Sequence, residues 1–333
     1  MLTVCLLFLA SAAAIYVACE YFVNGIEWVG WHLRLGATAV GSVLAAFGTA
    51  LPESAVTFMA VFFGSTQGGK DIGVGAALGG PLVLATVAYA VVGFALRHRA
   101  ARGAPSARID ADQRRLAHDQ SWFMVIFVAK LVLGVLVFSW KPWLALLFLS
   151  AYGIYIWREL GAGGASLAGE DIGPLKICPC QSHPSVFRAL LQTGVALVVI
   201  VVASNEFVRQ IGTIALWSGV SPHIAALVLA PVATELPEIM NAIIWVRQGK
   251  ERLALANISG SMMIQTTIPS AMAIGMTPWL LDTPLLVSGG ITLLSVAGLR
   301  WAFGHGTVGP NTLARSGALY VAFVIFGLVY FGA

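Results

Sequence analysis

The chain reads GTALPE at residues 48–53 and ATELPE at residues 233–238. Both stretches follow the pattern x-Thr-x-Leu-Pro-Glu, and each lies inside a long apolar run. Another glutamate precedes the last residue of each stretch, by 33 residues in the first copy (Glu20) and by 32 in the second (Glu206). The second half of the chain therefore repeats the first.

The composition places both copies in a membrane. Of the 333 residues, 58% are hydrophobic and 10% are charged, whereas a soluble domain carries about 25% charged residues. The mean hydropathy is +0.86. These values exclude a disordered chain, a collagen-like or coiled-coil chain and an ordinary soluble enzyme. They predict an all-α polytopic membrane protein, because about 20 apolar residues cross the hydrocarbon core as a helix.

Ten apolar runs predict ten transmembrane helices. The runs fall at 2–29, 35–64, 71–96, 121–139, 142–157, 187–217, 222–247, 251–277, 283–303 and 314–332. We therefore expect a first five-helix repeat over 1–157, a cytoplasmic connecting loop over 158–186 and a second repeat over 187–333. Because five is odd, the second repeat is inserted upside down, which gives the two inverted repeats typical of secondary transporters.

The distribution of Lys and Arg orients these helices. With the arginine-rich stretch 97–120 on the cytoplasmic side, fifteen Lys and Arg residues fall in cytoplasmic loops and three in outside loops. An excess of this size is typical of the cytoplasmic side and predicts that both termini lie outside. Lys130 falls within the fourth run, where we expect a structural role.

The two motif glutamates, Glu53 and Glu238, are predicted to meet near the middle of the membrane. A carboxylate at that depth costs about 2.5–3.5 kcal/mol on insertion scales, which indicates a function. Two close carboxylates repel each other unless a cation neutralises them, and hard cations such as Ca2+ prefer oxygen ligands. Thr49 and Thr234 stand four residues before the glutamates, so each hydroxyl shares a helix face with its carboxylate.

The run 251–277 is expected to add further oxygen ligands. Asn257, Ser261 and Gln265 are spaced by four residues and form a column on one helix face. Hydrogen bonding between helices is a second interpretation of this column. The corresponding stretch of the first repeat, residues 75–81, is small and apolar.

These motifs resemble the repeats of the cation/Ca2+ antiporter superfamily, the sodium/calcium exchanger integral membrane family. The family pattern is G-T-S-x-P-E, followed in the next helix by G-N-x-x-G-S-N-x-x-[DN], and the resemblance covers nearly the whole chain. It implies ten helices and alternating access by sliding of the first and sixth helices. It also implies that Glu53 and Glu238 are the calcium carboxylates, with oxygens from Thr49 and Thr234 beside them.

The chain departs from the family pattern at several ligand positions. Asn257 and Ser261 match the second pattern, whereas Gln265 stands where the family often has an acidic residue. Positions of the first repeat that have lost the side-chain oxygen are Ala76, Gly80 and Leu84. The serine after the motif threonine is replaced by Ala50 in one copy and by Glu235 in the other. Glu235 has two interpretations, as a relocated cation ligand and as a proton carrier.

The sequence thus predicts a secondary active antiporter that exchanges Ca2+, or a related cation, for Na+ across a prokaryotic-type inner (plasma) membrane. A proton-coupled exchanger of the same fold is the alternative. The expected partners are inorganic cations and the lipid bilayer, with no cofactor and no nucleic acid. A membrane enzyme is disfavoured, because no histidine lies mid-helix beside a Ser or Cys partner. A channel or sensor with the same fold would differ in needing no counter-ion.

Three features outside the motifs have alternative interpretations. Glu20 and Glu206 are interpreted either as gate residues or as structural pairs. Cys178 and Cys180 form a C-P-C with His183 close by, which is typical either of a soft-metal site or of reduced cytosolic thiols. The sequence does not indicate the oligomeric state or the direction of transport.

Overall fold

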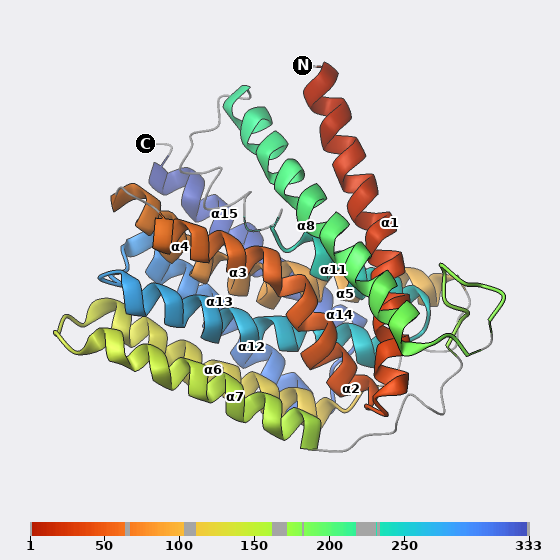
Figure 1. Cartoon of the computed structure of the whole chain (residues 1–333). Coiled ribbons are helices and arrows are strands. Elements are labelled where there is room, and N and C mark those ends of the chain that lie inside the picture. The colour runs from red at the N-terminus through yellow and green to blue at the C-terminus, as the bar shows by residue number, and fades with distance from the viewer. Residues whose placement is uncertain are drawn as a thin grey trace.

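Helices form the architecture of the protein (Figure 1). The computed structural model describes residues 2–63, 67–102, 111–161, 172–181, 183–217, 231 and 234–331. Within these ranges the chain forms α-, π- and 3-10 helices and no β-strand. The helices are α1 (Leu2–His32), α2 (Ala37–Ala39), η1 (Val40–Ala45), α3 (Ala46–Phe63), α4 (Gln67–Val83), η2 (Leu84–Ala88), α5 (Tyr89–Ala101), α6 (Gln113–Val135), η3 (Lys141–Leu144), α7 (Ala145–Gly161), α8 (Val186–Trp217), α11 (Leu236–Arg247), α12 (Glu251–Met276), α13 (Thr283–Gly304), α14 (Pro310–Arg315) and α15 (Gly317–Phe331).

These helices follow the apolar runs of the sequence, as expected for an integral membrane protein. In the described ranges, six helical spans are long and apolar enough to cross a membrane: Leu2–His32, Ala77–Ala101, Gln113–Val135, Val186–Phe207, Thr283–Gly304 and Pro310–Tyr330. Most of the stretch 222–235 lies outside the described residues. The count of ten helices, the inverted repeat and the outside position of the termini therefore stay predictions.

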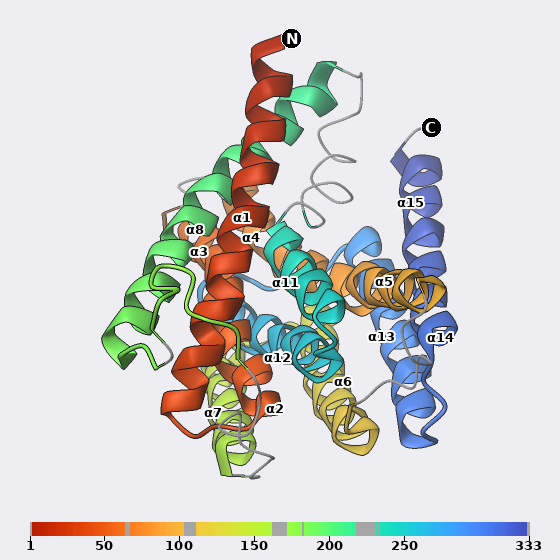
Figure 2. The same ribbon diagram turned by 90° about the vertical axis from the view of Figure 1, so that its right-hand side faces the viewer.

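Two long helices, α1 and α8, pack side by side and extend beyond the other helices at one end (Figures 1 and 2). Gly25 of α1 permits their close approach, because a Cβ there would lie 2.5 Å from Thr193 Oγ1. Further along, Phe8 stacks on Phe207 with ring centroids 4.7 Å apart. The two helices are thus joined by tight contacts at both places.

α12 is the central helix of the protein. It contacts α3, α4, α6, α7 and α11, and nearly all of its residues are buried. Where α12 crosses η1, a Cβ on Gly260 would overlap the backbone oxygen of Ser42, and a Cβ on Gly41 would lie 2.8 Å from Ala256 Cβ. Glycine at such crossings lets the backbones of membrane helices approach closely. The geometry of the core therefore depends on these two glycines.

Loops that the charge distribution assigns to one membrane side contact each other. Arg99 Nη1 donates to Val246 O at 2.9 Å and pairs with Glu251, which joins the stretch 97–120 to the α11–α12 turn. On the opposite set of loops, Lys141 Nζ donates to Trp279 O at 3.1 Å. The membrane side on which each set of loops lies stays a prediction.

Candidate cation-binding site

The second motif forms the beginning of α11. Glu235 is the N-cap residue, and Pro237 lies in the first turn, where its missing N–H leaves no helical hydrogen bond unmade. Glu235 and Glu238 are both buried, with exposed fractions of 0% and 1%. The motif thus places two carboxylates at a helix N-terminus, where the positive end of the helix dipole favours negative charge.

Glu235 and Gln265 are in direct contact. The amide nitrogen Nε2 of Gln265 donates to both carboxylate oxygens of Glu235, at 2.8 and 2.7 Å. α4 packs against this pair at Gly80, where a Cβ would lie 2.6 Å from Gln265 Oε1 and 2.8 Å from Glu235 Oε1. Glycine at position 80 therefore makes room for the pair, because a larger residue would displace both Gln265 and Glu235.

The predicted column on α12 is buried and rich in unsatisfied polar atoms. Asn257, Ser261 and Gln265 are each at most 1% exposed. Both polar side-chain atoms of Asn257, the Ser261 hydroxyl and Gln265 Oε1 have no hydrogen-bond partner among the described residues. Each buried polar atom left in this way costs about 1–3 kcal/mol. A row of such atoms on one helix face, with Gln265 in contact with the buried carboxylate of Glu235, fits a set of ligands for a cation.

Asn241 extends this set, although it is absent from the ligands predicted from the sequence. It lies on α11, one turn after Glu238, and is fully buried. Neither of its polar side-chain atoms has a hydrogen-bond partner in the part of the chain that the structure describes. Its spacing of three residues from Glu238 places both side chains on one helix face. The three-residue spacing from Glu238 is visible in the sequence, and Asn241 could have been predicted as a ligand from it.

The two motif threonines form hydrogen bonds within their own segments. Thr49 Oγ1 donates to Ala45 O at 3.1 Å, and Thr234 Oγ1 donates to Pro231 O at 3.1 Å. Each hydroxyl uses its proton in this bond, so the oxygen keeps lone pairs with which to bind a cation. Glu53 lies on α3, but its side chain is outside the described part of the structure. Its approach to the second motif therefore stays a prediction.

α1 packs along α11 and contacts it near both ends. Close to the motif, Cys19 Sγ donates to Pro237 O over 3.8 Å. Toward the other end, the buried carboxylate of Glu27 accepts a hydrogen bond from Trp245 Nε1 at 2.8 Å and pairs with Lys250. Any movement of α1 along α11 must break these contacts.

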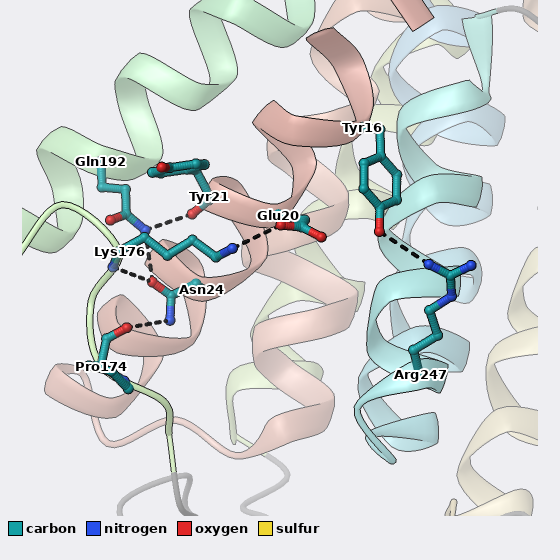
Figure 3. Close-up of polar contacts among 8 residues, drawn as sticks. All are labelled: Tyr16, Glu20, Tyr21, Asn24, Pro174, Lys176, Gln192 and Arg247. Atoms are coloured by element: carbon teal, nitrogen blue, oxygen red, sulfur yellow. Dashed lines mark hydrogen bonds and ion pairs between the residues drawn. The ribbon is translucent and has the colours of Figure 1, made fainter. Parts of the chain in front are cut away.

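Further polar contacts surround the exposed side of α1 (Figure 3). Glu20 pairs with Lys176 of the connecting loop at 2.9 Å, and Arg247 Nη1 of α11 donates to Tyr16 Oη at 3.2 Å. Asn24 also accepts a hydrogen bond from the Lys176 backbone, at 3.1 Å. The Glu20 side chain is 35% exposed. Glu20 thus joins α1 to the loop and lies outside the buried cluster.

The cysteines of the connecting loop are free thiols. Cys178 and Cys180 form no disulfide, and the His183 ring stacks on Trp31 with centroids 5.7 Å apart. Across the described ranges, no three His, Cys, Asp or Glu side chains gather into a group that would hold a metal ion. Cys178, Cys180 and His183 therefore do not gather into such a group in the part of the chain that the structure describes.

Apolar helices around buried carboxylates, amides and hydroxyls are typical of ion transporters of the membrane. A family model described as sodium/calcium exchanger protein matches residues 3–160 and 188–332. The chain belongs to this family, which is a family of cation exchangers and not of enzymes.

Known proteins with similar sequence and structure agree with this assignment. The uncharacterized membrane protein MJ0091 of Methanocaldococcus jannaschii is 24% identical over 268 residues, 80% of each chain. The inner membrane protein YrbG of Escherichia coli is 24% identical over 263 residues, 79% of this chain and 76% of the relative. A structure of the sodium-calcium exchanger NCX_Mj soaked with Na+ and Sr2+ superposes with a TM-score of 0.75, at 20% identity, over 97% of this chain and 98% of that chain. The last similarity establishes the fold.

Proposed function

We propose that this protein is a secondary active antiporter that exchanges Ca2+, or a related divalent cation, for Na+ across the prokaryotic inner (plasma) membrane. The observation that carries the proposal is the buried cluster on α11 and α12. It combines two carboxylates with amide and hydroxyl groups that lack hydrogen-bond partners among the described residues. The likeness to NCX_Mj, which is described as a sodium-calcium exchanger, supports the same conclusion.

Charge explains why such a cluster suits exchange. Glu235 and Glu238 bring negative charge into the buried interior, and Glu53 is predicted to do the same. Carboxylates in such a place repel each other unless cations neutralise them. Ca2+ and Na+ both bind hard oxygen ligands, so they compete for the same cluster. One ion leaves at low cost when the other replaces it, and this competition couples the two fluxes.

The proposed transport cycle is alternating access, in which α1 and α8 slide together across the other helices. The tight α1–α8 packing at Gly25 and Phe8 supports movement of the two helices as one unit. The bonds of Glu27 with Trp245 and Lys250 then hold one of the two end states. The cycle further rests on the predicted inverted repeats over 1–157 and 187–333, with both termini outside.

Proton coupling is the rival mechanism, and Glu235 is the residue on which it would depend. A single Gln265 nitrogen donates to both oxygens of Glu235, and an ionised carboxylate accepts at both oxygens without loss. This contact supports Glu235 as a cation ligand, and the flux measurements below distinguish this role from that of a proton carrier.

Flux measurements in proteoliposomes test the proposal. Purified protein is reconstituted, and uptake of radiolabelled Ca2+ is followed in vesicles loaded with Na+, in vesicles loaded with K+ and in vesicles given a pH jump. Uptake that requires internal Na+ is the expected result. Uptake driven only by the pH jump would replace Na+ with H+ as the coupling ion. No Ca2+ uptake under either gradient would overturn the calcium assignment.

A further inference from the structure

Lys130 is a fully buried lysine of α6 that the proposed cation site does not use. Its ammonium nitrogen Nζ donates to Ala77 O of α4 at 2.8 Å and to Ser270 Oγ of α12 at 3.2 Å. It also lies 4.5 Å from the centroid of the Phe127 ring, a distance at which the ring face stabilises a cation. The side chain thus ends between two helices of the core and does not reach toward a membrane surface.

Prolines explain why oxygen ligands are available at this place. Pro81 lies inside α4, four residues after Ala77, and Pro269 lies inside α12, four residues after Gln265. A proline has no N–H, so each carbonyl four residues earlier loses its helical partner. Lys130 bonds to the first of these carbonyls. The second, Gln265 O, accepts a hydrogen bond of 3.4 Å from the hydroxyl of Ser270.

This ammonium lies directly behind the buried cluster. Ser270 connects Lys130 to the backbone of Gln265, whose side chain donates to Glu235. Gly80, three residues after Ala77 on α4, faces the same Gln265 and Glu235 side chains. A protonated Lys130, connected to Glu235 through Ser270 and Gln265, would offset part of the negative charge that the carboxylates bring into the core.

We propose that Lys130 is a tethered cation, which fills a monovalent-cation position formed by carbonyl and hydroxyl oxygens of α4 and α12. This inference rests on the proposed exchange function. Carbonyl and hydroxyl oxygens are ligands of Na+-like hard cations, and here an ammonium joined to the chain takes them instead. The protein then needs one monovalent coupling ion fewer in each cycle, because the protonated Lys130 side chain supplies that charge.

Removal of the ammonium should open this position to a diffusible cation. We compare wild type, Lys130→Ala and Lys130→Met with the matched control Lys141→Ala. Lys141 is another buried lysine, and its ammonium donates to carbonyls of Leu133, Leu136 and Trp279 away from the cluster. The unfolding temperature of each purified protein is measured in choline, Na+ and methylammonium chloride.

The expected result is that Na+ or methylammonium raises the unfolding temperature of Lys130→Ala more than that of wild type or Lys141→Ala, since only a bound ligand stabilises the folded state selectively. In Ca2+ flux, the Hill coefficient for Na+ should rise by about one in Lys130→Ala, which has gained one site. Equal cation responses in all proteins, with an unchanged Hill coefficient, would overturn the proposal.

Loss of folding is also decisive. If neither Lys130→Ala nor Lys130→Met can be recovered folded in any of the three salts, no diffusible cation replaces the ammonium and the proposal fails. The two proposals fail separately. Wild type without Ca2+ flux under any gradient overturns the exchange function, whereas the unfolding measurements still decide whether Lys130 fills a cation position.

Discussion

The side-chain amide of Gln265 lies 2.8 and 2.7 Å from the two carboxylate oxygens of Glu235, in the fully buried centre of the protein. The contact joins α12 to the N-terminus of α11, two of the helices that carry candidate ligands. It fixes the orientation of the carboxylate and leaves the amide oxygen of Gln265 facing Gly80. The protein's own side chains thus position Glu235.

Glu235→Gln should separate the two interpretations of this carboxylate. The change removes one negative charge at nearly constant volume. If Glu235 is a cation ligand, the apparent affinity for Ca2+ should fall about tenfold or more, which corresponds to a loss of roughly 1.4 kcal/mol or more. The concentration dependence of Na+-driven Ca2+ uptake measures this. An unchanged affinity, with loss of the response to a pH jump alone, would instead identify Glu235 as a proton carrier.

Ser261→Ala should weaken Ca2+ binding without weakening the fold. The Ser261 hydroxyl has no partner among the described residues, so its removal should leave the free energy of unfolding unchanged or raise it by about 1 kcal/mol. Stabilisation by added Ca2+ should fall. Ser288→Ala is the matched control, because Ser288 is equally buried on α13 and its hydroxyl is also without a partner in the described ranges. Equal effects of both changes on Ca2+ binding would contradict a ligand role for Ser261.

Gly260→Ala should disrupt the crossing of α12 and η1. The added methyl group would overlap the backbone oxygen of Ser42, and a backbone cannot move aside as a flexible side chain can. Overpacking of this kind costs about 1–3 kcal/mol. Gly290→Ala on α13 is the control, since a Cβ there meets no atom within 4 Å. Thermal unfolding of the two variants in the same detergent compares them. Equal unfolding temperatures would show that the crossing is looser than the structure indicates.

Cross-linking should show that the α1–α8 contact persists during transport and that the α1–α11 contact does not. If α1 and α8 slide together, a short cross-link between them is tolerated, whereas one from α1 to α11 stops transport. Asn24 and Gln192 mark the first contact, at 2.9 Å, and Tyr16 and Arg247 the second, at 3.2 Å. Cysteine pairs at these positions are joined by a bifunctional thiol reagent, in a background where four native cysteines are replaced by serine: Cys5, Cys19, Cys178 and Cys180.

Ca2+ uptake before and after treatment gives the answer for each pair. Inhibition of the Tyr16–Arg247 pair alone is expected. Full transport with α1 cross-linked to α11 would rule out sliding of α1 against that helix. Inhibition of both pairs would contradict movement of α1 and α8 as one unit.

The residues of α12 show how far a sequence pattern leads. Asn257, Ser261 and Gln265 follow the helical period, so their common face and their burial could be predicted. The family could be predicted as well, because the two Pro-Glu motifs recur with matched spacing. The start of α12 at Glu251 agrees with the predicted run, whereas α6 begins at Gln113, eight residues before the run predicted at 121–139. The arginine-rich stretch 97–120 was wrongly predicted as a loop throughout, because the terminal turns of a helix can be polar.

Contacts between helices could not be predicted in the same way. Gln265 meets Glu235 across 30 residues, and Lys130 reaches Ala77 across 53. Such pairs depend on how three or more helices cross. The periodicity of one helix does not predict these crossings. For the same reason, the sequence alone indicates only that Gly80 lacks the ligand oxygen of the family pattern. In the structure, its small size makes room for the Gln265–Glu235 pair.

The central claim is that the two motif glutamates bind the transported divalent cation together. Uptake of radiolabelled Ca2+ into Na+-loaded proteoliposomes, compared among wild type, Glu53→Gln, Glu238→Gln and the Ser288→Ala control, tests it most directly. We predict that uptake persists in wild type and the control and is lost in both glutamate variants, although each variant remains folded. Undiminished uptake by either folded glutamate variant would contradict the claim.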